Sequence, residues 1–407
     1  MRSRVAVLAA GTLVLSTPLS IPASAQTVAQ TAPQAKPVTA AKPAAAKTAT
    51  NRYAQVNLVS DVAGKAAVTD PKLVNPWGLA MGKTLWVSGA GTGVATVYSG
   101  NAKKEQTEVA IPGGTPTGQV INTSTDEFMI KDKPAQFIFA SPSGAITAWN
   151  AEVNPKNAVI AAFTKNADYK GLAVMETNKG SFLLAPSFSH GRVHVYDSEF
   201  DRVALSRSQF RDPRMPSNYS PFNVEVVGNV IMVAYAKRDP ATGKAVPGKG
   251  NGFVSRFSAN GRFLGRFAQR GALNAPWAMI QAPRGFGALA GAVLVGNFGD
   301  GHVNAYNARS GRWLGALKSS NNQPIVLEGL WDLEPGTEAN GGTNSVWFAA
   351  GIDKAQHGLL GVLRPSDAGP LPGAGSASAP SASPAATPKP SASTTPTSSA
   401  GGSNYSY

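Results

Sequence analysis

Carboxylates, amides and tryptophans stand beside several apolar runs of this chain, where they could form a binding site together. These residues are Asn75, Trp77, Asn223, Glu225, Trp277, Asn297, Asp300 and Trp331. Aromatic side chains with a few polar groups are typical of sites for small molecules or glycans. Carboxylate and amide oxygens also suit Ca²⁺ or Mg²⁺, and we name Asn223, Glu328 and Asp332 as candidate ligands of such an ion. No other cofactor is indicated.

Other catalytic chemistries have less support in the sequence. Among the four histidines, His190 and His194 have the His-x3-His spacing of a zinc-ligand pair, but no cysteine and no third histidine lies near them in the sequence. The stretch Ser187-Phe188-Ser189-His190-Gly191 is not the Gly-x-Ser-x-Gly motif of a nucleophilic serine. The residue types therefore favour ligand binding, with metal-assisted chemistry as the alternative.

The elements that must position these residues are repeated along the chain. Asn75-Pro76-Trp77-Gly78 is followed by two apolar runs, and Ala275-Pro276-Trp277-Ala278 is followed by two similar ones. Repeats of about 40 to 55 residues built of short β-runs indicate a propeller or solenoid. We predict an all-β fold, a six-bladed β-propeller. Seven blades are the alternative, because the second repeat is poorly marked.

The last repeat contains three strand-like runs where the others contain four. Residues 55–60 (Gln-Val-Asn-Leu-Val-Ser) supply a further run at the other end of the domain. A propeller must join its first and last blades or leave an exposed strand edge. We therefore predict that the N-terminal strand closes the last blade. The innermost strands then line a channel, at whose mouth the candidate residues meet.

The recurrence of tryptophan has a second interpretation. Trp77, Trp277 and Trp331 occupy one position of the repeat. Recurrence with the repeat is typical of packing residues, so these side chains are expected as core wedges more than as ligand platforms. Asp300 with Gly301 is first of all a turn sequence.

The two ends of the chain differ in composition from its centre. Residues 1–25 combine Arg2 and Arg4, an apolar stretch and Ala23-Ser24-Ala25, which is the pattern of a signal peptide cleaved near Ala25. Residues 26–52 form a linker, and residues 365–407 a Ser/Pro/Ala/Thr-rich tail. Both are predicted to be disordered because they have few large apolar side chains. The propeller domain is assigned to residues 53–364.

The composition limits where the protein can be located and which partners it can bind. No further segment is long and apolar enough to span a membrane, and the chain has no cysteine. We expect a monomer that is secreted, or held in the periplasm or cell envelope. The net charge of +14 falls partly on the N-terminal segment, and no dense run of lysine or arginine indicates nucleic-acid binding.

The repeat pattern of Pro-x-Gly-Leu, an apolar strand and Gly-x-Val-x-Val-Tyr resembles the NHL class of propellers. Residues 53–364 are similar to an uncharacterised family of secreted bacterial proteins with predicted propeller folds. The segments that carry this resemblance are Asn57-Leu58-Val59-Ser60-Asp61, Asn75-Pro76-Trp77-Gly78-Leu79, Trp149-Asn150, Ala275-Pro276-Trp277 and Gly296-Asn297-Phe298-Gly299-Asp300-Gly301. The resemblance implies the fold and export but no established activity, because such propellers include both binding scaffolds and enzymes.

Two functions remain open from the sequence. The first is an exported binding protein whose partner is a small molecule, a glycan or another protein. The second is a Ca²⁺- or Mg²⁺-assisted hydrolase or lyase acting on a small molecule or sugar lactone at the channel mouth. Three or more Asp, Glu or Asn side chains gathered at one mouth would favour the second.

Overall fold

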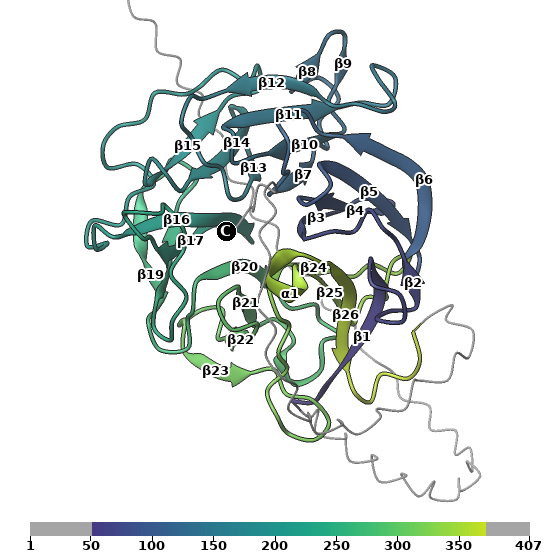
Figure 1. Ribbon diagram of the computed structural model, residues 1–407. Helices are drawn as coiled ribbons and strands as arrows, with labels where there is room; N and C mark the ends of the chain where they lie inside the picture. The colour runs from purple at the N-terminus through teal and green to yellow at the C-terminus, as the bar shows by residue number, and fades with distance from the viewer. Residues whose placement is uncertain (1–50, 372–407) are drawn as a thin grey trace, which may run out of the picture. The chain divides into compact units, whose positions relative to one another are not determined.

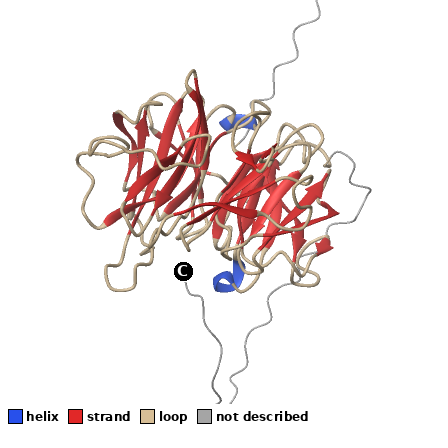
Figure 2. Ribbon diagram, turned by 90° about the horizontal axis from the view of Figure 1, so that it is seen from above, coloured by secondary structure: helices blue, strands red, loops and turns tan. Residues whose placement is uncertain are grey.

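The computed structural model describes residues 51–371, and these fold into six small antiparallel sheets around a central axis (Figure 1). The fold is a six-bladed β-propeller, as predicted. Within the described residues, the helical elements are η1 (Gly287–Leu289) and α1 (Ile352–Ala355). These two short helices lie on opposite faces of the ring (Figure 2).

Five blades follow one another along the chain, each with its first strand innermost. Blade 1 contains β3 (Pro76–Met81), β4 (Leu85–Gly89), β5 (Val94–Ser99) and β6 (Lys103–Ala110). Blade 2 contains β7 (Gln119–Ile121), β10 (Phe137–Ala140), β11 (Ala145–Trp149) and β12 (Val159–Phe163), with the hairpin β8 (Met129–Ile130) and β9 (Lys133–Pro134) in its first loop. Blade 3 contains β13 (Ala173–Thr177), β14 (Gly180–Ser187) and β15 (Arg192–Tyr196). Blade 4 contains β16 (Tyr219–Val227), β17 (Val230–Lys237), β18 (Gly252–Phe257) and β19 (Phe263–Gln269). Blade 5 contains β20 (Pro276–Gln281), β21 (Val293–Asn297), β22 (Val303–Tyr306) and β23 (Trp313–Ala316).

The sixth blade joins the two ends of the domain. It contains β24 (Leu330–Pro335), β25 (Val346–Ala350), β26 (Leu359–Pro365) and β1 (Tyr53–Ser60), with the short β2 (Val68–Thr69) beside β1. β1 pairs antiparallel with β26, from Tyr53 opposite Pro365 to Ser60 opposite Leu359. The predicted closure by the N-terminal strand is therefore confirmed.

Side chains reinforce the closure. The Ser60 hydroxyl donates to the carbonyl of Gly358 at 2.6 Å. The Asp61 carboxylate accepts the Gly358 N–H at 2.8 Å and contacts Nδ1 of His357 at 2.7 Å. These bonds fix the register of β1 at its end, so the strand cannot slip without leaving polar groups unpaired.

Burial changes from the axis to the rim, which explains why the strands differ in composition. All five residues of β4 are buried, because neighbouring blades cover both of its faces. The outermost strand β6, by contrast, has the sequence Lys-Lys-Glu-Gln-Thr-Glu-Val-Ala, and all of its residues except Val109 are partly buried or exposed. In blade 1, the near-continuous apolar run therefore belongs to an inner strand and the charged run to the outermost one.

Two details differ from the sequence prediction. Blade 3 has three strands, and only an isolated bridge between Tyr196 and Arg202 stands where a fourth would lie. The chain also continues to pack beyond residue 364, because Leu371 is buried and the Ser366 N–H donates to the Arg52 carbonyl. The predicted signal peptide, most of the linker and residues 372–407 lie outside the described residues.

Candidate functional site at the propeller axis

Three tryptophans close the channel. Trp77, Trp277 and Trp331 come from the innermost strands of blades 1, 5 and 6, and each is at most 1% exposed. The rings of Trp77 and Trp331 stack at 3.5 Å, and Trp277 meets both edge-on at 6.3 Å. Blades 1 and 5 are not neighbours, so the contact between Trp77 and Trp277 spans the axis. We call this cluster the tryptophan plug.

Hydrogen bonds hold the plug in place. The indole N–H of Trp277 donates to the carbonyl of Lys170, in the segment that leads into blade 3, at 2.9 Å. The indole N–H of Trp331 donates to the Asn75 side chain at 3.1 Å. The expected packing role of these tryptophans agrees with their burial, although they pack across the channel as well as between adjacent blades.

A cavity of about 470 Å³ lies over the plug, on the face where the innermost strands begin. We call it the mouth cavity. Its floor is made of Trp77, Trp331, Phe222 and Phe298. Phe298 stacks on Trp331 at 4.1 Å and is the one partly exposed aromatic of this floor. A ligand would therefore meet an apolar base with Phe298 as its accessible ring.

Polar groups form the rim of the mouth cavity. Lys170 pairs with Asp168 at 3.0 Å, and its ammonium lies 5.6 Å from the centre of the Trp77 ring. Residues 242–245, at the tip of a long loop after β17, cover another side. This loop folds back through a bridge between Arg238 and Ala245. Lys244 brings a second positive charge, and no ion pair of Lys244 occurs among the described residues.

A second, smaller cavity of about 210 Å³ lies further along the channel. Glu225, Asp332 and Glu334 all line it, and we call these side chains the channel carboxylates. Asp332 is buried and accepts the backbone N–H groups of Leu79 at 2.7 Å and Leu333 at 2.8 Å. Glu225 accepts a hydrogen bond from the Asn223 amide at 3.1 Å.

Burial makes the channel carboxylates difficult to ionise. Desolvation, with the nearby Asp332 charge, raises the pKa of Glu334 to about 8. Desolvation also raises the pKa of Asp332, and the pKa of Glu225 rises through desolvation and the charges of Asp332 and Glu334. Near neutral pH, protons therefore remain bound to part of this cluster.

The structure separates the predicted site residues into groups. Trp77, Trp277 and Trp331 form the plug, while Glu225 and Asp332 share the smaller cavity. Asn75 supports Trp331, and Asn223 donates to the Trp277 carbonyl at 3.0 Å in addition to Glu225. All of these lie near the axis.

The remaining predicted residues lie elsewhere. Asn297 holds a turn between blades 4 and 5, donating to the Ala272 carbonyl at 2.8 Å and to Asp300 at 3.0 Å. Asp300 lines a groove on the outer rim. Glu328 is exposed and lines none of the cavities at the axis described above. Within residues 51–371, no three His, Cys, Asp or Glu side chains are grouped so that they could hold a metal ion.

Sequence reasoning missed Glu334, Lys170, Lys244 and Phe298. A signal for Glu334 was present, because it follows Asp332 by two positions on one strand and so shares its face. Lys244 belongs to a Pro-, Gly- and Lys-rich insertion that is visible in the sequence. Nothing in the sequence indicates that this insertion folds over the mouth.

The fold and the residues at the axis define the class of this protein. It is a six-bladed propeller whose channel is closed by the tryptophan plug, with a cavity above the plug. The chain belongs to the family of two proteins of Acanthamoeba polyphaga mimivirus. It is 32% identical to Uncharacterized protein R648 over 327 residues, covering 75% of this chain and 78% of that one. It is 31% identical to Uncharacterized protein L690 over 324 residues, covering 75% and 84%. These relatives are viral, so the bacterial family implied by the sequence resemblance has no support from them.

Two further comparisons complete this picture. No protein-family model matches the chain. Among solved structures, a streptogramin B lyase has a TM-score of 0.44 and 11% identity, covering 77% of this chain and 97% of that one. A hydrazine synthase from Kuenenia stuttgartiensis has a TM-score of 0.43 and 14% identity, covering 72% and 80%. Identity this low transfers no activity between proteins. No helix among the described residues has the length and apolarity of a membrane span.

Proposed function

We propose that this protein is an exported binding propeller that takes a small ligand in the mouth cavity. The observation that carries the proposal is the cavity of about 470 Å³ above the tryptophan plug. Its volume is in the range of small-molecule sites, and an apolar floor with a few polar groups is their usual composition. The plug makes this cavity a closed-ended pocket instead of a passage.

The charges on the rim indicate the kind of ligand. Lys170 is already paired with Asp168, whereas Lys244 faces the cavity without a carboxylate partner among the described residues. A compact ligand with an apolar body and one acidic group would place the body on Phe298 and the acid beside Lys244.

Export is supported by the N-terminal sequence. The basic start, the apolar stretch and Ala23-Ser24-Ala25 have the order of a cleaved signal peptide. Expression with the native N-terminus in a secreting host tests this. The proposal expects extracellular or periplasmic protein whose first residue is Gln26, and an uncleaved intracellular product would contradict it.

The ligand proposal is tested with small aromatic and aliphatic carboxylates and their amides, by thermal shift and titration calorimetry. Lys244→Gln should weaken binding of an acid and leave its amide unaffected. Phe298→Ala should weaken both. Lys103→Gln is the matched control, since Lys103 is an exposed lysine of the outer strand β6. Binding that is unchanged in both mouth variants would overturn the assignment of the site.

The alternative, a metal-assisted hydrolase or lyase, rests on the channel carboxylates. Their common cavity is the observation in its favour, and Glu328 does not line it. Against it, within residues 51–371 the three carboxylates are not grouped closely enough to hold an ion by themselves. Bound Ca²⁺ or Mg²⁺ would favour the ionised carboxylates and so oppose their raised pKa values. A Ca²⁺- or Mg²⁺-dependent rise in melting temperature that Glu334→Gln abolishes would support this alternative. If neither ion changes the melting temperature, this alternative is rejected and the binding function is kept.

A further inference from the structure

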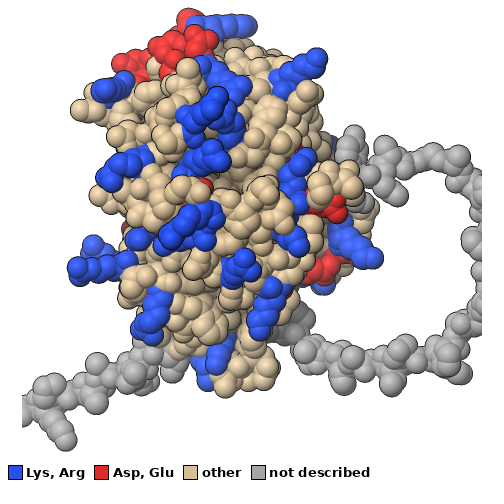
Figure 3. Space-filling model, turned by 90° about the vertical axis from the view of Figure 1, so that its left-hand side faces the viewer, with Lys and Arg blue, Asp and Glu red and all other residues tan. Residues whose placement is uncertain are grey.

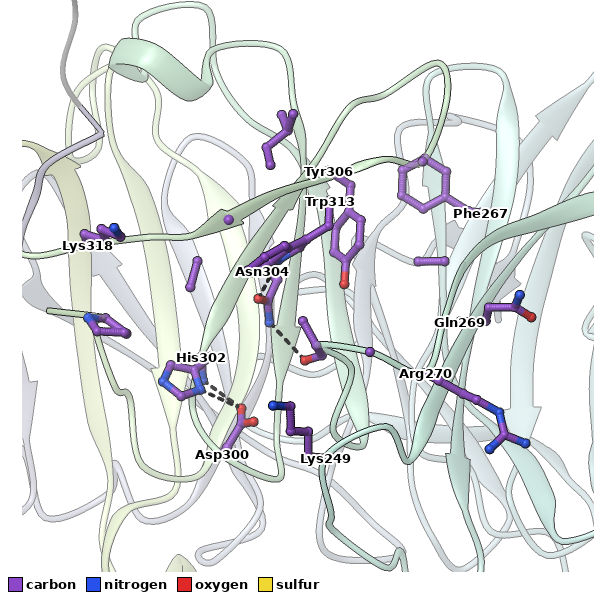
Figure 4. A pocket seen from close by; sticks show the side chains of 18 of the residues that line it. Lys249, Phe267, Gln269, Arg270, Asp300, His302, Asn304, Tyr306, Trp313 and Lys318 are labelled. Carbon is purple, nitrogen blue, oxygen red and sulfur yellow. Dashed lines mark hydrogen bonds and ion pairs between the residues drawn. The ribbon is translucent and has the colours of Figure 1, made fainter. Parts of the chain in front are cut away.

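A large cavity lies away from the axis, between the outer parts of blades 4 and 5. It has a volume of about 1070 Å³ and is lined by β19, β22 and β23 with the loop that leads from β19 to β20 (Figure 4). Much of its wall is made of small residues, among them Gly271, Ala272, Gly315 and Ala316. Neighbouring blades diverge toward the rim, and such small side chains leave the gap open. We call this cavity the rim groove.

An exposed tryptophan lies in the rim groove. Trp313 is 53% exposed, whereas the three tryptophans of the plug are fully buried. Its indole N–H donates to Oδ1 of Asn304 at 3.1 Å. Asn304 is itself buried, and its Nδ2 donates to the carbonyl of Ala272 at 3.3 Å. The indole nitrogen is thus bonded to the fold while about half of the Trp313 surface stays accessible to a ligand.

The charges of the rim groove are mainly positive. Lys249, Arg270 and Lys318 line it, and none of them forms an ion pair among the described residues. Asp300 is the one acidic residue of the lining. Its carboxylate is already engaged by His302 at 3.3 Å and by the Asn274 amide at 3.1 Å. An anionic ligand would therefore meet three available cations.

The positive surface continues onto the neighbouring blade. Figure 3, which views the molecule from the left-hand side of Figure 1, shows basic side chains spread over this face with few acidic ones. A second cavity of about 520 Å³ is lined by Arg192, Arg207, Arg211 and Arg238. Its one carboxylate, Asp212, is bonded to Arg266 at 2.6 Å. Because Arg266 also lines the rim groove, this pair connects the two cavities.

We propose that the rim groove binds a segment of an acidic polysaccharide, a chain of sugars that carry carboxylates. A sugar has an apolar C–H face that can lie on the open side of Trp313, and its carboxylates would pair with Lys249, Arg270 and Lys318. The exposed amide of Gln269 can bond to hydroxyls. A recessed groove can enclose part of a sugar chain, whereas a flat membrane surface cannot enter it. This site shares no lining residue with the mouth cavity, so it is independent of the function proposed there.

The test uses the whole protein with oligogalacturonate as the probe and its methyl-esterified form as the neutral counterpart. Titration calorimetry at physiological salt should show binding of the acid and at least tenfold weaker binding of the ester, about 1.4 kcal/mol. Trp313→Ala should weaken binding of the acid about tenfold. Phe163→Ala is the matched control, because Phe163 is 62% exposed on the outer strand of blade 2, and it should bind as the parent does.

A second pair of variants tests the charges. Arg270→Gln with Lys249→Gln should reduce both affinity and its dependence on salt, whereas Lys103→Gln with Lys131→Gln should not. Unchanged affinity in Trp313→Ala would overturn the proposal. Binding of DNA, polyphosphate or anionic vesicles as tight as that of the oligosaccharide, and insensitive to Trp313, would also overturn it, because it would show a general polyanion surface.

Discussion

At the scale of single residues, the channel carboxylates are the least ordinary feature. Desolvation raises the pKa of Glu225, Asp332 and Glu334; the Asp332 charge raises the pKa of both glutamates further, and the Glu334 charge adds to the rise at Glu225. A carboxyl whose folded-state pKa is raised stabilises the fold below its unfolded pKa, and this contribution is lost as pH rises toward the folded pKa. The cluster therefore favours the folded state in mild acid and opposes it in mild base.

Glu334→Gln should remove part of this pH dependence. Since the pKa of Glu334 is raised from 4.5 to about 8, the variant should become more stable than the parent above pH 8, by on the order of a few kcal/mol. Near pH 5 the two should be similar. Urea unfolding at both pH values measures the difference. Glu338→Gln, at an exposed position, is the control, and an equal effect of both variants would contradict the assignment.

His194 affects the stability of the fold at acidic pH, whereas the channel carboxylates affect it at basic pH. Its Nδ1 lies 2.8 Å from the Tyr169 hydroxyl, and burial with the nearby Arg202 charge lowers its pKa to about 3. A histidine kept neutral in the fold does not lower the free energy of unfolding above its unfolded pKa of 6.5. It lowers that free energy increasingly as pH falls from 6.5 toward 3. His194→Gln should therefore shift acid unfolding, followed by circular dichroism, to lower pH. The same change at the partly exposed His302 should not, and an unchanged midpoint in His194→Gln would be the contrary result.

At the scale of elements, the closing strand β1 has the largest consequence. It covers the edge of β26 and is fixed by Ser60 and Asp61. Tyr53 extends the contact to blade 5, where its ring stacks on Phe286 at 4.5 Å and its hydroxyl donates to the Phe286 carbonyl at 3.0 Å. One strand thus ties together both the last blade and its neighbour.

Removal of residues 53–61 should leave the edge of β26 open, and the protein should aggregate or fail to fold. A milder variant tests one contact of β1 without removing any part of the chain. Tyr53→Phe keeps β1 but removes its hydroxyl bond, and should lower the unfolding free energy by about 1 kcal/mol. Size-exclusion chromatography and thermal melting measure both. A soluble monomer with an unchanged melting temperature after the deletion would refute the role of β1.

At the scale of the whole molecule, the folded unit is slightly longer than the repeat pattern indicates. Leu371 is buried in the cluster that contains Leu58 and Trp347, six residues after β26 ends. Burying a leucine side chain contributes about 1.5 to 3 kcal/mol. Residues 365–371 therefore belong to the fold, although their composition resembles that of the tail.

A protein trimmed to residues 51–371 should consequently melt close to the full-length temperature. A protein trimmed to residues 53–364 should melt several degrees lower, because it lacks the Leu371 contact and the bond from Ser366 to Arg52. Differential scanning calorimetry compares the two, with full-length Leu371→Ala as the point control. Identical melting of both trimmed proteins would show that these contacts contribute nothing.

The sequence by itself determined the architecture, since strand periodicity and the repeat of Pro-Trp at 76–77 and 276–277 are local patterns. It also determined the closure, because a count of strands shows one missing at the end and one spare at the start. It did not mark the packing of Leu371, since one apolar residue in a Pro- and Gly-rich stretch carries no period.

The site was decided by tertiary structure. Only the ring places Trp77 against Trp277 across the axis, folds Lys244 over the mouth, and sends Asp300 to the rim while Asp332 enters the channel. These outcomes depend on which blades face each other and on how loops cross the surface. Residues hundreds of positions apart meet through such contacts, and no local pattern records them. The rim groove is lined by Gly271, Ala272, Gly315 and Ala316, and only packing brings these two segments of small residues to one cavity.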